Sequence, residues 1–278
     1  MKQIKHMILL CLFCLTGIAA QAQTGPADNE IWYTAAAKLT EVTGTGTTQG
    51  LHKNVFADAD GKTLTMTSHT WEETTGKGVI TFGGDIATVG ENAFYRCVDL
   101  SSVTFSANVT SIGKQAFRQC SKLATVTFAE GSKLEAIGEL AFHYCSALSS
   151  ITIPASVTSI GNQAFMQCSK LATVTFAEGS KLEAIGETAF NGCSLLSSIT
   201  IPASVTSIGQ KAFLQCSKLA TVTFAEGSKL ETIGEVAFQQ CSALSSVTIP
   251  ASVTSIGKQA FNQCSKLATV TFAEGSKL

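Results

Sequence analysis

The stretch CSKLATVTFAEGSKLEAIGE, from Cys120 to Glu139, decides the fold because the chain repeats it. The same residues return unchanged at 168–187, return with Thr232 as the one substitution at 216–235, and begin again at Cys264. Aligned on Ile-Gly, or Val-Gly in the first copy, successive units start at intervals that alternate between 23 and 25 residues. A repeat of this length is typical of a solenoid, in which each unit forms one coil.

Each unit carries the pattern Ile-Gly-x-x-Ala-Phe-x-x-Cys-x-x-Leu-x-x-Val-x-Phe. The apolar spacing from Ile112 to Cys120 fits one face of a helix, so we predict one or two helical turns there. The hydrophobic period changes to two at residues 125–128, Thr-Val-Thr-Phe, which predicts a short strand. A polar connection follows, either Ala-Glu-Gly-Ser at 129–132 or Pro-Ala-Ser at 154–156. The expected coil is therefore one short strand and one short helix.

One such unit cannot fold alone. It buries about eight apolar side chains, each large one worth about 1.5–3 kcal/mol, whereas fixing its backbone costs about 1–2 kcal/mol for every residue. The balance becomes favourable only when neighbouring units stack and share one core. We therefore predict an α/β repeat architecture, a solenoid of about eight turns over residues 79–278, with a sheet on one wall and short helices on the other.

The repeated pattern resembles the BspA-type leucine-rich repeat of bacterial surface proteins. The stretches EIWYTAAAKLTEV at 30–42 and KGVITFGGDIATVGENAF at 77–94 look like the entry segment of that family. The resemblance implies a right-handed leucine-rich-repeat solenoid that is exported to the cell surface or beyond. It also implies a role in adhesion to host matrix proteins or other cells, and no catalysis.

The ends of the chain differ from the array. Residues 1–22 read as a secretory signal peptide, because Lys2 and Lys5 precede an apolar run that is too short to span a membrane. Residues 23–78 hold both tryptophans and are predicted to form a β-rich N-terminal cap and linker, with a hairpin at 55–67. We expect the solenoid to stop mid-repeat at Leu278 without a C-terminal cap, either because the chain is a truncated member of a longer array or because that end docks onto another molecule. The expected location is secreted, extracellular or at the cell surface.

Composition and motifs argue against several classes of function. The formal net charge is −1, so nucleic acid is not an expected partner. No metal, cofactor or catalytic spacing is found around the histidines, and we predict that the chain is not an enzyme. His143 is expected at an outward, solvated helix position. Gly44-Thr45-Gly46 is expected to be a loop, and Asp58-x-Asp60-Gly61 a turn rather than half of a calcium site.

Eight cysteines occupy one position of the repeat, once in each unit. A disulfide ladder or a metal ladder is one reading, and a column of buried thiols is the other. None of these eight cysteines belongs to a Cys-x-x-Cys pair that would support a zinc site, so we predict structural core thiols. They are Cys97, Cys120, Cys145, Cys168, Cys193, Cys216, Cys241 and Cys264.

Two surfaces are candidates for partner binding. The strands should align outward hydroxyls into rows, which could contact a protein or a glycan, could resemble an ice-binding array, or could simply suit an exposed strand. These sheet-face residues are Thr125, Thr127, Thr152, Thr173, Thr175, Thr200, Thr221 and Thr223. The copies differ most just after the repeated Phe, on the predicted helical wall, which we expect to carry individual recognition. The candidates there are Arg118, His143, Tyr144, Met166, Asn191, Leu214, Gln239 and Asn262.

The expected function is that of a secreted or surface-exposed, adhesin-like protein that binds an extracellular protein or glycan through its repetitive surface. Many weak contacts on one rod sum to firm attachment. The alternative is a structural spacer, or a rod that self-associates through its open C-terminal end.

Overall fold

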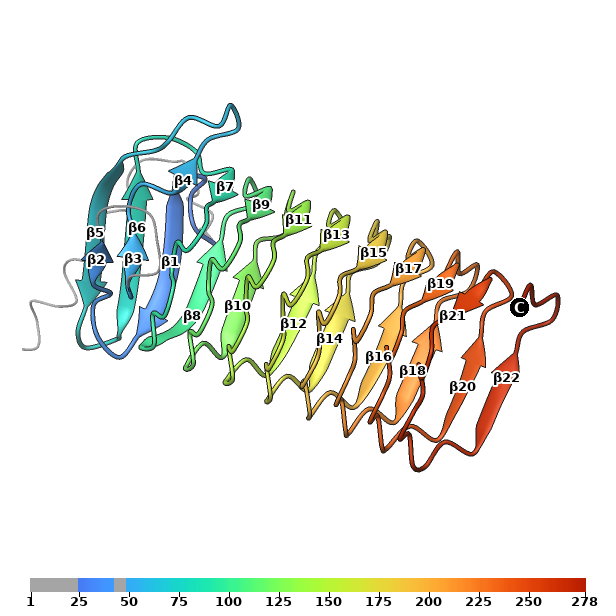
Figure 1. The fold of residues 1–278 in the computed structure, drawn as a ribbon. Coiled ribbons are helices and arrows are strands. Elements are labelled where there is room, and N and C mark those ends of the chain that lie inside the picture. The colour runs from blue at the N-terminus through green and yellow to red at the C-terminus, as the bar shows by residue number, and fades with distance from the viewer. Residues whose placement is uncertain (1–24, 43–48) are drawn as a thin grey trace, which may run out of the picture.

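A computed structural model of the chain describes residues 25–42 and 49–278. These residues form a solenoid whose coils stack along one axis, with an antiparallel sheet at its N-terminal end (Figure 1). The predicted signal peptide and the predicted loop at Gly44-Thr45-Gly46 lie outside the described residues.

One wall of the solenoid is built from parallel strands, one in each coil. In Thr125-Val126-Thr127, the valine is buried and both threonines are exposed, so the strand has one core side and one solvent side. We call the solvent side of this wall the sheet face. Its strands are β8 (Leu100–Phe105), β10 (Thr125–Phe128), β12 (Ser150–Ile153), β14 (Thr173–Phe176), β16 (Ser198–Ile201), β18 (Thr221–Phe224), β20 (Ser246–Ile249) and β22 (Thr269–Phe272).

A second sheet runs along another side of the solenoid, made of two-residue strands that end in the isoleucine of Ile-Gly. Its strands pair in parallel from coil to coil, and β4 (Phe56–Ala57) adds to it antiparallel to β7. The members are β7 (Thr88–Val89), β9 (Ser111–Ile112), β11 (Ala136–Ile137), β13 (Ser159–Ile160), β15 (Ala184–Ile185), β17 (Ser207–Ile208), β19 (Thr232–Ile233) and β21 (Ser255–Ile256).

The N-terminal end is covered by antiparallel strands. β1 (Glu30–Ala35) pairs with β8 on one side and with β6 (Lys77–Phe82) on the other, and β5 (Met66–Glu72) pairs with β6. A small parallel pair, β2 (Glu41–Val42) and β3 (Leu51–His52), lies nearby. Between β4 and β5, an antiparallel bridge joins Ala57 to Thr63, and Asp58 Oδ1 accepts two backbone amides of the turn, so this segment is a hairpin closed by an aspartate.

The predicted helices are wrong. Among residues 25–42 and 49–278 the structure contains no helix, and the segments after each Ile-Gly are successions of tight turns. In one coil, the amides of Ala116, Arg118 and Cys120 each donate to the carbonyl three residues earlier. The alternate amides donate to the next coil instead; Gln119 N, for example, is 2.7 Å from His143 O.

The backbone explains why the turns do not join into a helix. Gln115 and Gln119 have φ angles of 56° and 62°, in the left-handed region that interrupts a right-handed helix. The resulting structure is a solenoid of strands and turns, in which amides directed along the solenoid axis pair neighbouring coils. A turn that closes every three residues buries nearly the same positions as a helix, so the apolar spacing could not distinguish the two.

The core is made of columns of identical side chains. The Phe rings of the Ala-Phe dipeptide stack from Phe94 to Phe261, with centroids 4.8–5.4 Å apart and planes within 12° of parallel. The sequence pattern thus places each ring over the same ring of the preceding coil. This column fixes the register of the walls on either side of it.

Candidate binding face

The sheet face presents the predicted rows of hydroxyl groups. Thr127 lies beside Thr104 of β8, and Thr152 lies beside Thr175, because the strands pair in register. All eight sheet-face residues predicted from the sequence are exposed, namely Thr125, Thr127, Thr152, Thr173, Thr175, Thr200, Thr221 and Thr223. The structure therefore places them together on one continuous surface.

The strands of the sheet face are not evenly paired. β12 pairs with β14 at four positions, as β16 does with β18 and β20 with β22. By contrast, β14 meets β16 at a single pair, Thr173 with Ser198, and β18 meets β20 at a single pair. β10 and β12 belong to different sheets. The face thus opens at every second junction, as the spaces between strand pairs in Figure 1 show.

Proline explains where the strands separate. At the closed junctions, Ala177 N donates to Ile153 O at 3.0 Å and Ala225 N donates to Ile201 O at 3.0 Å. The residue that would donate across the open junction, after β16, is Pro202, which has no N–H. Pro154 and Pro250 occupy the same position after β12 and β20. The strand ends therefore diverge wherever the sequence reads Thr-Ile-Pro instead of Thr-Phe-Ala.

Each open junction holds a groove, and the three grooves are copies of one another. Their volumes are about 510 Å³ between β10 and β12, 600 Å³ between β14 and β16, and 500 Å³ between β18 and β20. In each, the Thr-Val-Thr-Phe strand forms one side, and the threonine, proline and alanine of the next coil form the other. The central groove is lined by Thr173, Thr175, Phe176, Ser198, Thr200 and Pro202, among others.

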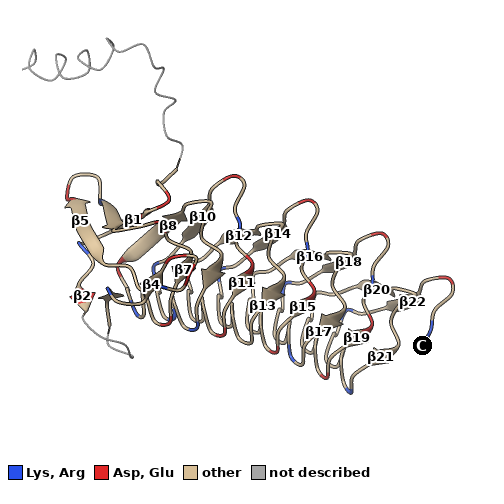
Figure 2. Ribbon diagram, turned by 90° about the horizontal axis from the view of Figure 1, so that it is seen from above, with Lys and Arg blue, Asp and Glu red and all other residues tan. Residues whose placement is uncertain are grey.

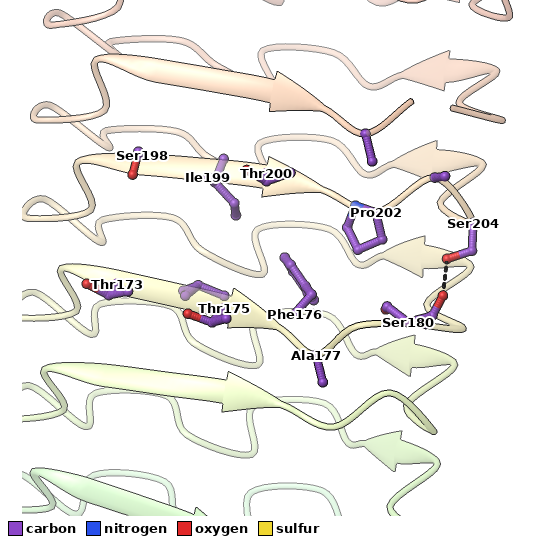
Figure 3. Close-up of a pocket in the computed structure, with 14 residues that line it drawn as sticks. Thr173, Thr175, Phe176, Ala177, Ser180, Ser198, Ile199, Thr200, Pro202 and Ser204 are labelled. Carbon is purple, nitrogen blue, oxygen red and sulfur yellow. Dashed lines mark hydrogen bonds between the residues drawn. The ribbon is translucent and has the colours of Figure 1, made fainter. Parts of the chain in front are cut away.

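The central groove is closed at both ends (Figure 3). At one end, Thr173 and Ser198 are the paired residues of β14 and β16. At the other, Ser204 Oγ donates to Ser180 O across 3.0 Å. The equivalent serine of the first groove, Ser156, makes the same bond at 2.9 Å. The groove is therefore a defined depression within the face, rather than an open strand edge.

The grooves are nearly free of charge. Glu130 is the one charged residue that lines any of the three in the described part of the chain. The loops after β10, β14, β18 and β22 project beside them and carry acidic groups toward their tips (Figure 2). The glutamates of these loops are Glu130, Glu178, Glu226 and Glu274. The grooves are thus nearly neutral inside, and each bordering loop carries one glutamate at its tip and one lysine three residues later.

A fourth depression lies at the N-terminal end of the same sheet. It has a volume of about 380 Å³ and is lined by Trp32, Thr34, Ser102 and Thr104 with residues of β6. Trp32 is paired with Thr104 in the antiparallel ladder, and its Nε1 donates to Glu30 Oε2 at 3.0 Å. Apart from the alternation of EIWYTA, nothing in the sequence predicts this depression, because its other walls come from β6 and β8.

The predicted helical wall is a wall of turns, and its candidate residues do not share one environment. Tyr144 and Asn262 are exposed, whereas Arg118, Met166, Leu214 and Gln239 are half-buried. His143 and Asn191 are buried, each with less than a tenth of its surface exposed. The expectation that His143 is solvated is therefore wrong. Adjacent coils lie one strand spacing apart, so the residues of neighbouring coils cover the first side chain after each Phe.

His143 lies in an environment that disfavours charge. Its ring centroid is 4.4 Å from that of Tyr144, and neither ring nitrogen has a hydrogen-bond partner among the described residues. Burial, aided by the positive charge of Arg118, lowers the pKa of His143 to about 4. The unfolded chain keeps the ordinary value near 6.5. Between these values the unfolded state binds a proton that the folded state does not, so stability falls as the pH is lowered through this range.

We expect the variant His143→Met to lose this pH dependence, since Met166 fills the same position one coil later. Between pH 6.5 and pH 4, the wild-type chain should lose roughly 1–3 kcal/mol more stability than the variant. Urea unfolding at several pH values measures the difference. Equal losses in the two proteins would show that His143 is not the group that titrates.

The cysteines form a column of thiols beside the ring column. All eight are buried and none is in a disulfide. In the second and later coils each Sγ donates to the Phe carbonyl of the preceding coil, as from Cys168 to Phe142 O at 3.1 Å. Burial raises the pKa of every one of these thiols, to about 12 for Cys97 and Cys168. Such thiols remain protonated and unreactive in the folded chain.

A partly buried polar cluster lies at the N-terminal end of the solenoid. The Tyr33 hydroxyl lies 2.8 Å from His69 Nε2, and His69 Nδ1 lies 2.7 Å from Glu41 Oε1, which is itself part of an ion pair with Lys53. Burial raises the pKa of Tyr33 to about 12 and lowers that of His69, although Glu41 opposes the second shift. The contact between the protonated Tyr33 hydroxyl and the neutral His69 ring connects β1 to β5. Neither group is an activated nucleophile.

Residues 25–42 and 49–278 contain no helix that is long and apolar enough to cross a bilayer. They also contain no group of three or more histidine, cysteine or acidic side chains arranged to hold a metal ion.

Comparison with solved structures relates this geometry to known proteins. The pneumococcal vaccine antigen PcpA is similar with a TM-score of 0.54 and 26% identity over 69% of this chain, which spans 57% of that antigen. A leucine-rich-repeat protein from Bacteroides ovatus has a TM-score of 0.52 and 22% identity, over 85% of this chain and 70% of that one. Comparison with curated protein sequences found no significant match.

The family comparison matches the repeats themselves. The model of the BspA-type leucine-rich-repeat region matches residues 87–197 and 183–277, in six copies. These ranges contain the ring column, the thiol column and all three grooves. The chain therefore belongs to the BspA-type leucine-rich-repeat family.

Proposed function

We propose that this chain is a secreted, cell-surface binding protein that attaches to extracellular macromolecules through its sheet face. The observation that carries the proposal is the row of three equivalent grooves on an exposed, hydroxyl-rich surface. The similarity to a vaccine antigen supports a surface location, and the family supports a non-enzymatic scaffold. The adhesin-like role follows from repetition, because several weak contacts on one rigid rod give firm attachment.

The sheet face is better suited to this role than the wall of turns. Of the candidate side chains that vary along the wall of turns, only Tyr144 and Asn262 are exposed, and the others are half-buried or buried. The second residue after each Phe, such as Gln119 or Tyr144, has a left-handed φ angle, which constrains the side chains that can occupy it. The grooves, by contrast, are open to solvent and share the same threonine, phenylalanine, proline and alanine lining in all three copies.

A charge-matched pair of variants tests the proposal. Thr152→Arg, Thr200→Arg and Thr248→Arg together place a long side chain in each groove. Ser159→Arg, Ser207→Arg and Ser255→Arg add the same charge at the same spacing on the second sheet. Both sets replace side chains that are exposed or half-buried, so both should fold.

The measurement is retention of the chain on panels of immobilised extracellular proteins and polysaccharides. We expect the wild-type chain and the serine-site variant to be retained by the same partners, and the threonine-site variant to lose about tenfold or more in affinity. Equal retention of the two variants, or no retained partner for the wild-type chain, contradicts the proposal.

A further inference from the structure

We propose that the three grooves bind a neutral, extended polysaccharide, with successive sugar pairs of one chain in successive grooves. This inference rests on the proposed function, since it names the ligand of the same face. Four features of the grooves carry it: the chemistry of their lining, an acceptor left free by proline, their charge and their spacing.

The lining has the two kinds of group that a sugar ring requires. Thr175 and Thr200 bring hydroxyls to opposite sides of the central groove, and each hydroxyl can both donate and accept a hydrogen bond, as a sugar hydroxyl does. The half-buried Phe176, beside the buried Pro202, supplies apolar surface between them, against which the C–H face of a sugar ring can pack (Figure 3). An apolar floor with a few placed polar groups is the usual composition of a ligand site.

The proline also changes the hydrogen-bonding capacity of the groove. In the closed junction the Ala177 N–H donates a hydrogen bond to the Ile153 carbonyl. Pro202 has no N–H and cannot donate the equivalent hydrogen bond to the Phe176 carbonyl. The Phe176 carbonyl at the groove is thereby deprived of its ladder donor. A ligand rich in hydroxyl donors can satisfy such an acceptor, and the same substitution recurs at Pro154 and Pro250 in the other two grooves.

The charges favour a neutral sugar over an acidic one. The groove linings contain no Lys, Arg or His in the described residues, so nothing there would pair with a carboxylate or a sulfate. The projecting loops beside the grooves carry Glu130, Glu178 and Glu226, each followed three residues later by a lysine, so they add no net positive charge that would attract an anionic chain. Nucleic acid and acidic glycans are therefore disfavoured at this face.

The spacing favours an extended polymer. Adjacent grooves are two coils apart, and two strand spacings amount to about 10 Å. Two sugar rings of an extended β-linked chain cover that distance. Three residues of extended peptide also cover about 10 Å. A peptide bound in this way relies on a ladder along an open strand edge, however, and the second and third grooves are each bounded at one end by a residue pair, Thr173 with Ser198 and Thr221 with Ser246. The sugar chain needs no such edge.

Titration calorimetry with oligosaccharides of known length tests the inference. The probes are the neutral hexasaccharides of β-1,4-linked glucose and mannose, their disaccharides, an acidic hexagalacturonate and a threonine-rich peptide of similar length. We expect at least one neutral hexasaccharide to bind, at least about tenfold more tightly than its disaccharide because linked sites raise the effective concentration. Tighter binding of the acidic sugar or of the peptide, or no binding of any neutral sugar, overturns the inference.

Two sets of variants assign the binding to the grooves. Phe128→Leu, Phe176→Leu and Phe224→Leu together remove the ring from every groove, and Thr127→Val, Thr175→Val and Thr223→Val remove hydroxyls without changing shape. Each set should weaken hexasaccharide binding about tenfold, while the arginine variant of the second sheet binds as the wild type. If the phenylalanine set fails to fold, as thermal unfolding will show, the valine set alone decides. Full affinity in the valine set overturns the inference.

The outcome is separable from that of the proposed function. A chain that is retained by extracellular proteins through its threonine face, yet binds no neutral sugar, keeps the proposed function and loses this inference. A chain whose partners are unaffected by the groove-blocking arginines loses both.

Discussion

Replacing Gly186 with alanine is expected to destabilise the solenoid severely. A Cβ at Gly186 would lie 2.6 Å from the carbonyl carbon of Gly161, 2.7 Å from the Ile160 oxygen and 2.8 Å from the Asn162 nitrogen. All three are backbone atoms of the preceding coil, which cannot move without breaking the stack. We expect a loss of more than about 4 kcal/mol, a size reached only by severe backbone or core defects.

The matched control is Gly179→Ala in the same coil. Gly179 has a φ angle of 72°, but a Cβ there would meet nothing within 4 Å. The cost should be limited to the left-handed backbone, about 1–2 kcal/mol. Urea unfolding followed by circular dichroism compares the two variants with the wild type. Similar losses at both positions would show that coil-to-coil contact is not what requires the glycine of Ile-Gly.

Phe190→Ala is the second change with a large expected effect. The Phe190 ring lies in the middle of the column, 5.2 Å from Phe165 and 5.4 Å from Phe213, and is fully buried. Truncation leaves a cavity and removes stacking contacts on both sides, so we expect a loss of about 3–5 kcal/mol. Because each coil contacts only its neighbours, a defect of this size uncouples the units on either side of it.

Phe176→Ala serves as the control for Phe190→Ala. Phe176 belongs to the same coil but is half-buried at a groove. Its truncation should cost less than half as much, and its unfolding transition should stay cooperative. We expect the Phe190→Ala transition to broaden or divide into two, which the slope of the urea transition reports. A single sharp transition with a small shift in midpoint would argue against the ring column as the element that couples the coils.

The stacked core and the grooves depend on the same repeat. The column of rings and the glycine contacts hold the coils in register on the inside, whereas proline separates the strand ends on the outside. The outer face can therefore open at every second coil without loss of the stack. This separation of roles gives a rigid rod with regularly placed sites, which is the geometry that avidity requires.

Much of the architecture could be predicted from the sequence. The repeat length, the strand at Thr125-Val126-Thr127 and the outward hydroxyls are properties of local pattern, and the structure contains each of them. Whether the segment after Ile-Gly forms a helix or a chain of turns could not be predicted from the same pattern. Positions 0, 4, 5 and 8 after Ile112 are buried in a helix and in a chain of three-residue turns alike. The choice depends on whether the amide of Gln119 bonds within its own coil or to His143 of the next.

The candidate site shows the same division. The alternation of Thr-Phe-Ala with Thr-Ile-Pro is visible in the sequence. The grooves that it produces could not be predicted without knowing which strands are neighbours. Only then does Pro202 become a missing donor to Phe176, and the two residues become the walls of one groove. The burial of His143 has the same origin, since residues from the adjacent coils cover it.

The sequence by itself determined the solenoid, its repeat and the membership of each core column, because identical units must bury identical faces. Tertiary structure alone decided the conformation of the turns, the burial of His143 and the position of the grooves. The physical reason is that each of these depends on a hydrogen bond or contact between coils. Residues about two dozen positions apart in the chain become neighbours only after the units have stacked.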